Sequence, residues 1–254
     1  MQQSPANPNG LPIEQYTYDP VHNRKSSAHQ PGAWTYNENN ELQAYGNGPD
    51  EQTYAYDANG NTIEQKSGDP QNPGRDRVFI YNAAERLSEI RDGGVTIAKY
   101  EYDPLGRRIR KEANGIETWF QYADEGLVSE YEDDGTPRRE SGWILGSSWG
   151  SGPLWIADVF ATGLTVNFYH NDHLDTPQRL SSSTGDTTWK MISGSFGETH
   201  VVIETTKNQQ RFPGQYQDVE VDTNYNSMRD YSFETGRYLQ TDPLGFGGGI
   251  NAFV

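Results

Sequence analysis

Short runs in which polar and apolar residues alternate dominate this chain. Residues 107–112 (RRIRKE) and 117–122 (ETWFQY) are two clear examples. A two-residue period is typical of a β-strand with one buried face and one face in water. Residues 82–91 come closest to a helical pattern, but their phase in the repeat described next favours a turn followed by a strand. The pattern therefore predicts an all-β chain of short strands.

A unit that begins with tyrosine recurs through the first half of the chain. Its clearest copy is YDPLG at residues 102–106, and the copies begin at Tyr18, Tyr36, Tyr56, Tyr81, Tyr102 and Tyr122. A spacing of about 20 residues has room for two strands and two turns, so each unit predicts one β-hairpin. The longest interval contains a loop insertion at residues 69–74 (DPQNPG).

The residues after each tyrosine have the chemistry of a tight turn. Asp or Asn is favoured as the first residue of a type I turn, and Pro or Ala suits the second. A hairpin with a G1 bulge needs positive φ four residues after the tyrosine. Those positions, including one after an additional Tyr131, are His22, Asn40, Gly60, Glu85, Gly106, Gly126 and Gly135. Glycine, Asn and His tolerate positive φ, so Glu85 is the residue that does not fit.

A single hairpin cannot bury its own apolar face, so neighbouring hairpins must pair edge to edge. The right-handed twist of the strands would then curl the strip. The predicted fold class is all-β, with repeated β-hairpins forming a long curled strip. The repeat tyrosines are expected to pack between neighbouring strands, with sugar stacking on an exposed ladder of rings as the alternative.

Charge and composition exclude several classes of function. The chain has 20 basic and 36 acidic residues, a net charge of -16, which opposes binding to nucleic acid and to an anionic membrane surface. Cysteine is absent, which excludes disulfides and thiolate zinc sites. No apolar run is long enough to span a membrane, and residues 1–12 do not resemble a Sec signal peptide. We therefore expect neutral or basic partners, no nucleic acid and no membrane span.

Three blocks of sequence resemble the Rhs (rearrangement hotspot) proteins and their YD repeats. The first is YDPLGRR at residues 102–108, and the second is YHNDHLDTP at residues 169–177. The third joins RFPGQY at residues 211–216 to ETGRYLQTDPLG at residues 234–245. In this order the blocks are similar to the C-terminal part of an Rhs core, and the resemblance covers nearly the whole chain from about Tyr16.

The resemblance implies both a fold and a task. In Rhs proteins, in the C components of toxin complexes and in teneurins, a strip of hairpins spirals into a hollow shell, which in the toxins holds a toxic C-terminal domain. We accordingly expect a flexible segment at residues 1–15, YD hairpins at 16–140 and a core-associated region at 141–254. The chain would then be a partial shell whose partners are a toxin domain, other shell segments or further copies of itself. Export by a dedicated system other than Sec, after a cytoplasmic stage, is expected.

The family's shell is closed by an aspartyl autoprotease, and two residues of this chain match it. Asp242, in the DPLG block, resembles the first catalytic acid, and Arg229, thirteen positions earlier, resembles the required arginine. Hydrolysis on this plan needs a second carboxyl group as proton donor. No second Asp-Pro-x-Gly block follows before Val254, so self-cleavage is expected to be vestigial or incomplete. The alternative for Asp242 is a turn-opening role like that of Asp103.

Three further motifs carry weaker chemical signals. The segment at residues 170–175 (HNDHLD) has metal-ligand side chains, but strand alternation splits them between two faces. The segment at residues 146–150 (GSSWG) has the spacing of a serine-hydrolase elbow, but it lacks the following helix. The acidic run at residues 130–134 fits a repeat turn better than a calcium site. Neither a metal nor a cofactor is expected.

Two other functions are consistent with the sequence. The chain could be an extracellular glycan-binding or adhesion module, which exposed Tyr and Trp faces would favour. It could also be an inactive, truncated Rhs fragment, as the missing second acid suggests. A strand edge without a cap predicts self-association in either case.

Overall fold

A computed structural model describes residues 13–69 and 76–254 of the chain. Within these ranges the protein consists of strands, turns and two short 3-10 turns, η1 (Gly48–Asp50) and η2 (Gly245–Gly247), with no α-helix. Most of the predicted flexible segment at 1–15 and of the loop insertion at 69–74 lies outside the described residues. None of the described helical turns is long and apolar enough to cross a membrane.

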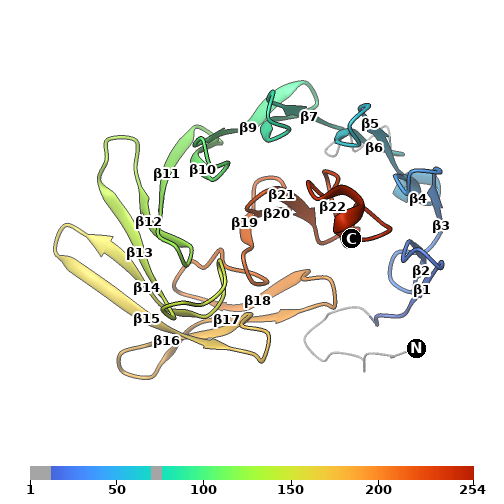
Figure 1. Cartoon of the computed structure of the whole chain (residues 1–254). Coiled ribbons are helices and arrows are strands. Elements are labelled where there is room, and N and C mark those ends of the chain that lie inside the picture. Colours follow the sequence, from blue (N-terminus) through green and yellow to red (C-terminus); the bar gives the residue numbers. More distant parts are fainter. Residues whose placement is uncertain (1–12, 70–75) are drawn as a thin grey trace. The chain divides into compact units, whose positions relative to one another are not determined.

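Sixteen strands follow one another in chain order in a single antiparallel sheet (Figure 1). They are β3 (Ala33–Tyr36), β4 (Leu42–Gly46), β5 (Gln52–Tyr56), β6 (Thr62–Ser67), β7 (Arg77–Tyr81), β8 (Leu87–Asp92), β9 (Val95–Tyr102), β10 (Arg108–Ala113), β11 (Ile116–Tyr122), β12 (Leu127–Tyr131), β13 (Pro137–Trp143), β14 (Pro153–Phe160), β15 (Gly163–Asn171), β16 (Pro177–Ser182), β17 (Thr187–Ser193) and β18 (Thr199–Glu204). Each inner strand pairs with the strands before and after it, so the chain advances by hairpins. The all-β fold and the strip of repeated hairpins are confirmed.

Six shorter strands lie outside the long sheet. Near the amino terminus β1 (Tyr16–Tyr18) pairs with β2 (Arg24–Ser27). Towards the carboxyl terminus β19 (Tyr216–Asp218) pairs with β20 (Thr223–Asn226), and β21 (Arg229–Ser232) pairs with β22 (Arg237–Tyr238). All three pairs are antiparallel.

Where Asp or Asn follows a repeat tyrosine, it closes the turn through one side-chain oxygen. In the Tyr56 repeat, Asp57 Oδ1 accepts the backbone N–H groups of Asn59 and Asn61, each at 2.9 Å. The same two bonds recur in the turns opened by Asp19, Asn37, Asn82, Asp103 and Asp172. Asp and Asn both carry this oxygen, so either residue can open the turn.

Positive φ occurs at every position that the repeat predicted. The values are 69° at His22, 63° at Asn40, 80° at Gly60, 58° at Glu85, 80° at Gly106, 151° at Gly126 and 82° at Gly135. The pairing register shifts beside the tyrosine in most of these hairpins, as a bulge requires. Glu85 has a specific compensation, because its carboxylate accepts bonds from the side-chain amides of Asn59 and Asn61 in the neighbouring turn.

The repeat tyrosines link consecutive hairpins through their hydroxyl groups. Tyr36 donates to the carbonyl of Arg24 at 2.8 Å, and Tyr122 donates to the carbonyl of Arg108 at 2.8 Å. Each acceptor lies six residues after the previous repeat's tyrosine. Burial raises the pKa of Tyr36 to about 12, in line with a ring packed between strands. The packing role therefore uses both the ring and the hydroxyl, which leaves less of the ring for stacking on a sugar.

The chain forms two compact units. The first comprises the described residues up to Lys99 with Gly194–Phe196 and Met228–Val254, and the second comprises Tyr100–Ser193 with Gly197–Ser227. The predicted limits at residues 15 and 140 are not tested by this division and stay predictions.

In the first unit, the carboxyl-terminal segment packs against the early strands. Tyr45 in β4 donates to Glu234 Oε1 at 2.6 Å, and Thr62 in β6 donates through its backbone N–H to the carbonyl of Leu239 at 2.8 Å. Figure 1 shows β21 and β22 facing these strands. Trp34 and Tyr45 stack with ring centroids 4.5 Å apart, which gives this unit an aromatic core.

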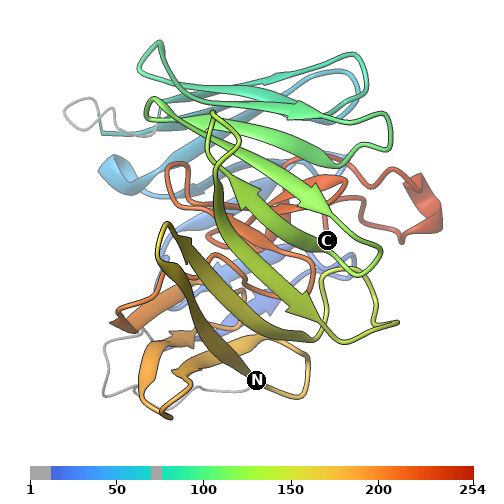
Figure 2. The same ribbon diagram turned by 90° about the vertical axis from the view of Figure 1, so that its left-hand side faces the viewer.

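In the second unit, residues 206–227 pack against the long hairpins. Figure 2 shows the strands of these hairpins side by side. Tyr169 in β15 donates to Asn208 Oδ1 at 2.9 Å. The apolar core of this unit consists of Ile156, Leu180, Trp189 and Met191, all nearly inaccessible to solvent. The late part of the chain thus contributes to the interior of each unit.

Candidate functional site

The hairpin of β21 and β22 brings the two predicted catalytic residues together. Tyr231 lies opposite Tyr238, and the backbone N–H of Leu239 donates to the carbonyl of Asp230 at 2.8 Å. This register places Arg229, at the start of β21, beside the turn that follows β22. Thirteen residues of sequence separation are therefore closed by a tight hairpin.

Arg229 and Asp242 form an ion pair in which neither side chain is fully accessible. Arg229 Nη2 lies 3.1 Å from Asp242 Oδ2, and the two side chains are 15% and 16% exposed. The guanidinium also stacks on Tyr238, with Cζ 3.6 Å from the ring centroid. The stacking and the partial burial fix the guanidinium in place, so it acts as a positioned positive charge beside the carboxylate.

Asp242 also opens a turn, as the alternative interpretation predicted. Its Oδ1 accepts the backbone N–H of Leu244 at 2.8 Å, and its carbonyl accepts that of Gly245 at 2.8 Å. A Cβ atom at Gly248 would lie 2.7 Å from Asp242 Oδ2, so the glycine run allows the backbone to approach the carboxylate. Gly248 thus serves close packing. Asp242 is thus a turn residue and an Arg-paired carboxylate at once.

This arrangement supplies the base, but not the acid, of an acid–base hydrolysis. A carboxylate paired with a guanidinium can take a proton from water, and the guanidinium can stabilise developing negative charge. Donation of a proton to a scissile carbonyl needs a further acidic group. The described residues contain no cluster of three or more His, Asp or Glu side chains suited to a metal ion.

The HNDHLD segment is a turn of the same kind as the YD turns. His170 Nε2 lies 2.8 Å from Ser181 Oγ, and Asp172 Oδ1 accepts the N–H groups of Leu174 and Thr176. Asp175 adopts φ of 65°, a left-handed conformation that glycine adopts more readily than other residues. These side chains serve the hairpin.

The GSSWG segment lies in the connection between β13 and β14 and has no hydrolase-elbow geometry. Its Trp149 stacks over Tyr122, with ring centroids 5.4 Å apart. Gly150 adopts φ of 66°, and a Cβ atom there would lie 2.4 Å from the Cα of Gly214. The final glycine is required by close backbone packing.

The acidic run at residues 130–134 is divided between two environments. Glu130 is buried and lies 3.9 Å from Arg139 Nη1, and Tyr216 donates to it at 3.4 Å. Asp134 Oδ1 instead accepts the backbone N–H of Thr136 in an exposed turn. The run is thus a turn with one inward-facing carboxylate.

A buried ionic cluster in the second unit was missed from the sequence. Arg108 Nη1 lies 2.5 Å from Asp218 Oδ2, and both side chains are 1% exposed. Lys111 Nζ lies 3.1 Å from Asp218 Oδ1 and 3.1 Å from Glu220 Oε1. The Arg108 guanidinium also lies within 4.2 Å of the Tyr225 ring centroid. Arg108 belongs to the YDPLGRR motif, but its alternation with Ile109 places it on the polar face of the strand, so no local signal indicated its burial.

Comparisons with known proteins assign this chain to a family. The family model described as Teneurin YD-shell matches residues 3–247. The toxin protein Tse5 of Pseudomonas aeruginosa is 29% identical over 79% of this chain and 17% of its own length. The double-stranded DNA deaminase toxin A of Burkholderia cenocepacia is 26% identical over 98% of this chain and 19% of its own length.

Solved structures agree on the fold. The pore of a Photorhabdus luminescens Tc holotoxin with a mutated TccC3 matches with a TM-score of 0.54 and 15% identity, over 95% of this chain and 16% of that chain. The chain spans less than a fifth of the length of each of these three proteins. The chain therefore has the fold of a shell segment built from β-hairpins. It belongs to the YD-shell family of Rhs-type proteins.

Proposed function

We propose that this chain is a wall segment of an Rhs-type shell that encloses a toxin domain. The observation that carries the proposal is the strip of sixteen strands paired in chain order, a form that can surround a cargo when it is extended. Two relatives are named as toxins, and this chain corresponds to less than a fifth of each. The remainder of such a polypeptide would supply the rest of the wall and the cargo.

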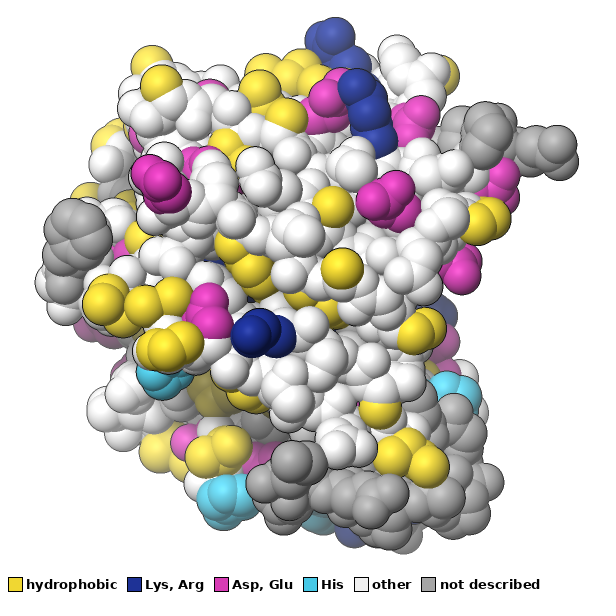
Figure 3. Space-filling view, turned by 90° about the vertical axis from the view of Figure 1, so that its right-hand side faces the viewer, with side chains coloured by type: hydrophobic (Ala, Val, Ile, Leu, Met, Phe, Trp, Pro, Cys, Tyr) yellow, Lys and Arg dark blue, Asp and Glu magenta, His cyan; other side chains and the backbone are white. Residues whose placement is uncertain are grey.

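The outer strands of the sheet suggest how the wall continues. β3 and β18 stand at its two ends, and an outer strand offers backbone groups to a further strand. We propose that other shell segments, or a second copy of the chain, pair there. On the face drawn in Figure 3, acidic side chains lie among the few basic ones, which supports the expected lack of a nucleic-acid partner. We also propose that a dedicated secretion system exports the protein.

Enclosure predicts that a domain following Val254 in the parent polypeptide is protected from proteases. We expect limited proteolysis of the native-source polypeptide to leave that domain intact. After the shell is unfolded in urea and the urea is diluted into the same protease, the domain should be digested. Intact mass and peptide mapping read out both states. A native-source polypeptide without any following domain, or a domain digested equally in both states, would contradict enclosure.

We further propose that Asp242 and Arg229 form part of an aspartyl-type self-cleaving site. In this scheme Asp242 takes a proton from the attacking water while Arg229 stabilises negative charge on the scissile carbonyl oxygen. A second carboxyl group elsewhere in the parent polypeptide donates the proton that the carbonyl oxygen receives. The support is the ion pair of 3.1 Å and the partial burial of both side chains.

Asp242→Asn tests the chemistry without removing the turn. Asparagine keeps the Oδ1 that accepts the Leu244 N–H but loses the charge. In the chain extended past Val254 by a second Asp-Pro-x-Gly block, we expect cleavage to slow by about a hundredfold or more, because the base is lost. Intact mass spectrometry over time measures the cut.

The matched control is Asp57→Asn, the same substitution in a turn-opening aspartate of the same unit. Asn37 and Asn82 already occupy the equivalent place in their own repeats, so this variant should fold and cut like the unaltered protein. Undiminished cutting by the Asp242→Asn protein would remove Asp242 from the mechanism and would leave the shell proposal standing.

A further inference from the structure

A cavity of about 160 Å³ in the first unit has two buried arginines in its walls. Its lining comes from β1, β2, the turn between β21 and β22, and Phe196 in the connection from β17 to β18. The two arginines are Arg24, which is 4% exposed, and Arg237, which is 5% exposed. A cavity of about 150 Å³ can admit a molecule as large as benzene, so this space has room for a small organic group.

Arg237 is held by amide and carbonyl oxygens. Its Nη1 donates to Asn23 Oδ1 at 2.9 Å, and its Nη2 donates to the carbonyl of Asn40. None of these acceptors carries a negative charge. Burial lowers the pKa of Arg237, and the nearby charge of Arg24 adds to that shift. The two guanidinium groups therefore give the cavity a positive charge that the wall does not neutralise.

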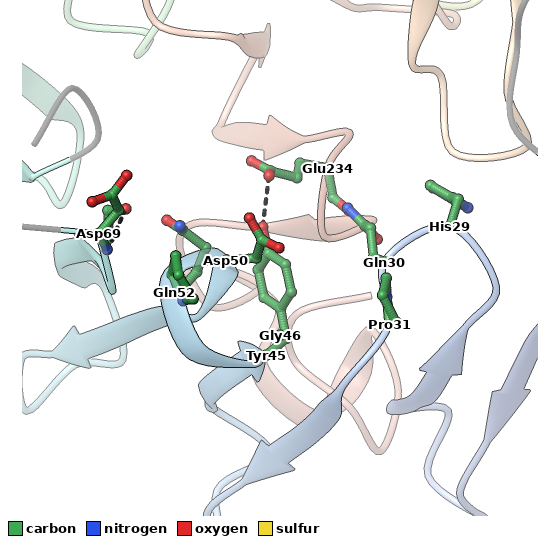
Figure 4. Close-up of a pocket in the computed structure, with 11 residues that line it drawn as sticks. His29, Gln30, Pro31, Tyr45, Gly46, Asp50, Gln52, Asp69 and Glu234 are labelled. Atoms are coloured by element: carbon green, nitrogen blue, oxygen red, sulfur yellow. Dashed lines mark hydrogen bonds between the residues drawn. The ribbon is translucent and has the colours of Figure 1, made fainter. Parts of the chain in front are cut away.

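Arg24 uses only one of its nitrogens to bond the surrounding chain. Its Nη1 donates to Gln30 Oε1 at 3.0 Å and to the backbone carbonyl of Glu234 at 3.3 Å. The carboxylate of Glu234 is engaged elsewhere, because its Oε1 accepts from the hydroxyl of Tyr45 at 2.6 Å, as Figure 4 shows. Burial lowers the pKa of Arg24, which is the direction expected for a guanidinium without a counter-ion.

The other edge of the Arg24 guanidinium is left without a partner. In the part of the chain that the structure describes, neither Nε nor Nη2 makes a hydrogen bond, and both are shielded from solvent. The N–H of Nε and one N–H of Nη2 point the same way, so this edge offers two parallel donors. The two oxygens of a carboxylate match that pair of donors. A buried charged donor without an acceptor is costly, so a carboxylate placed here would gain two bonds.

Aromatic rings cover the faces of this guanidinium and leave its edge unbonded. Arg24 Cζ lies 4.1 Å from the ring centroid of Phe196 and 4.8 Å from those of Tyr16 and Trp34. Such contacts hold a cation in place without neutralising its charge. A Cβ atom at Gly236 would lie 2.7 Å from Nη2, so glycine at this position keeps a side chain away from the unbonded edge.

Tyr18 is the wall residue that can open this edge. Burial raises the pKa of Tyr18 and the charge of Arg24 opposes that shift, which places the phenol beside the guanidinium. Neither Nε nor Nη2 is bonded to it, and Tyr18 is 47% exposed. An outward turn of the ring would therefore admit a ligand to the guanidinium.

We propose that this cavity binds a carboxylate group, which accepts two parallel hydrogen bonds from Arg24 Nε and Nη2 while Arg237 contributes its charge. The side chain of an aspartate or glutamate in another polypeptide segment and a free small carboxylic acid share this chemistry, and the experiment below separates them. The proposal goes beyond enclosure and self-cleavage and depends on neither.

Calorimetric titration with two blocked peptides tests the charge of the ligand. We expect the isolated chain to bind acetyl-Gly-Asp-Gly-amide about tenfold more tightly than acetyl-Gly-Asn-Gly-amide, because the amide has no charge and only one acceptor oxygen. Arg24→Lys keeps the positive charge but loses the parallel donors, so it should weaken binding of the aspartate peptide by about tenfold. Arg91→Lys, the same substitution at an exposed arginine of the same unit, should leave binding unchanged.

The NMR signal of the Arg24 Nε–H group reports where the ligand lies, and it needs no folded variant at that position. We expect this signal to shift on addition of the aspartate peptide and to stay in place with the asparagine peptide. Equal affinity for both peptides, or an unmoved Nε–H signal, would overturn the proposal. A folded Arg24→Lys protein that binds like the Arg91→Lys protein would overturn it as well.

Acetate and inorganic phosphate separate the possible sources of the anion. If the aspartate peptide binds about tenfold more tightly than acetate, the ligand is an acidic side chain of a polypeptide. Equal binding of the two supports a free carboxylic acid. Tighter binding of phosphate than of either carboxylate would overturn the carboxylate assignment in favour of a phosphate site.

Discussion

Asp218→Asn should destabilise the protein by about 3–5 kcal/mol, because it leaves a buried guanidinium without its counter-ion. Arg108 and Asp218 make two hydrogen bonds, at 2.5 and 3.0 Å, in a place that water does not reach. Asparagine preserves the shape but not the charge. Urea unfolding followed by tryptophan fluorescence measures the loss, since five of the six tryptophans lie in the second unit with this pair.

Two nearby acids supply controls with different expectations. Asp133 is exposed in a repeat turn, so Asp133→Asn should change the free energy of unfolding by no more than about 0.5 kcal/mol. Burial, followed by the charge of Asp218, raises the pKa of Glu220 despite Lys111. Glu220→Gln should therefore cost much less than Asp218→Asn at neutral pH. Equal losses from the substitutions at 218 and 133 would refute the buried-pair argument.

Acid should erase the difference between the native protein and the Asp218→Asn protein. Burial alone would raise the pKa of Asp218, but Arg108 and Lys111 outweigh it and hold that pKa below its usual range. A carboxyl group with a lowered folded-state pKa contributes stability above its unfolded pKa of about 3.9 and loses it as the pH falls through the folded value. The gap between the two unfolding free energies should accordingly stay constant near neutrality and shrink below about pH 4.

Gly150→Ala should be the second severe substitution, with a loss of about 3 kcal/mol or more from backbone strain and overlap together. The residue has φ of 66°, and the added Cβ would meet the Cα of Gly214 at 2.4 Å. The backbone N–H of Gly214 also donates to the carbonyl of Gly150 at 3.0 Å, so the two chain segments cannot separate without losing that bond.

Gly146→Ala isolates the conformational part of this effect. Gly146 has φ of 74°, but a Cβ atom there would meet nothing within 4 Å. The Gly146→Ala protein should lose about 1–2 kcal/mol of unfolding free energy, which is the cost of the left-handed backbone alone. Urea unfolding of both variants measures the contrast. If the two alanine variants lose the same free energy, close packing against Gly214 does not matter to stability.

The repeat made the local structure predictable because each turn is closed by its own residues. The aspartate or asparagine oxygen bonds two N–H groups within its own turn, as Asp57 does, and positive φ is required four residues after the tyrosine. Even Glu85, which looked unsuited to that conformation, follows the rule. Its compensation comes from the adjacent hairpin and could not be read from its own turn.

The candidate site was predictable in part for a different reason. Arg229 and Asp242 were chosen by resemblance to a family motif, and the short hairpin between them brings them within 3.1 Å. The cavity beside Arg24 could not be predicted, because its walls come from residues near 20, 196, 236 and 254, which are far apart in the chain.

Alternation, turn chemistry and a twenty-residue period were sufficient to specify strands, hairpins and their pairing in chain order, since those depend on interactions between residues close in sequence. The folded chain alone decided which interior charges meet. Arg108 and Asp218 are 110 residues apart, and no local pattern indicates that a late segment returns to an early strand to neutralise it. Long-range contacts of this kind depend on how successive hairpins bring distant segments together. The position of each segment is the sum of the twists and turns of all the hairpins before it.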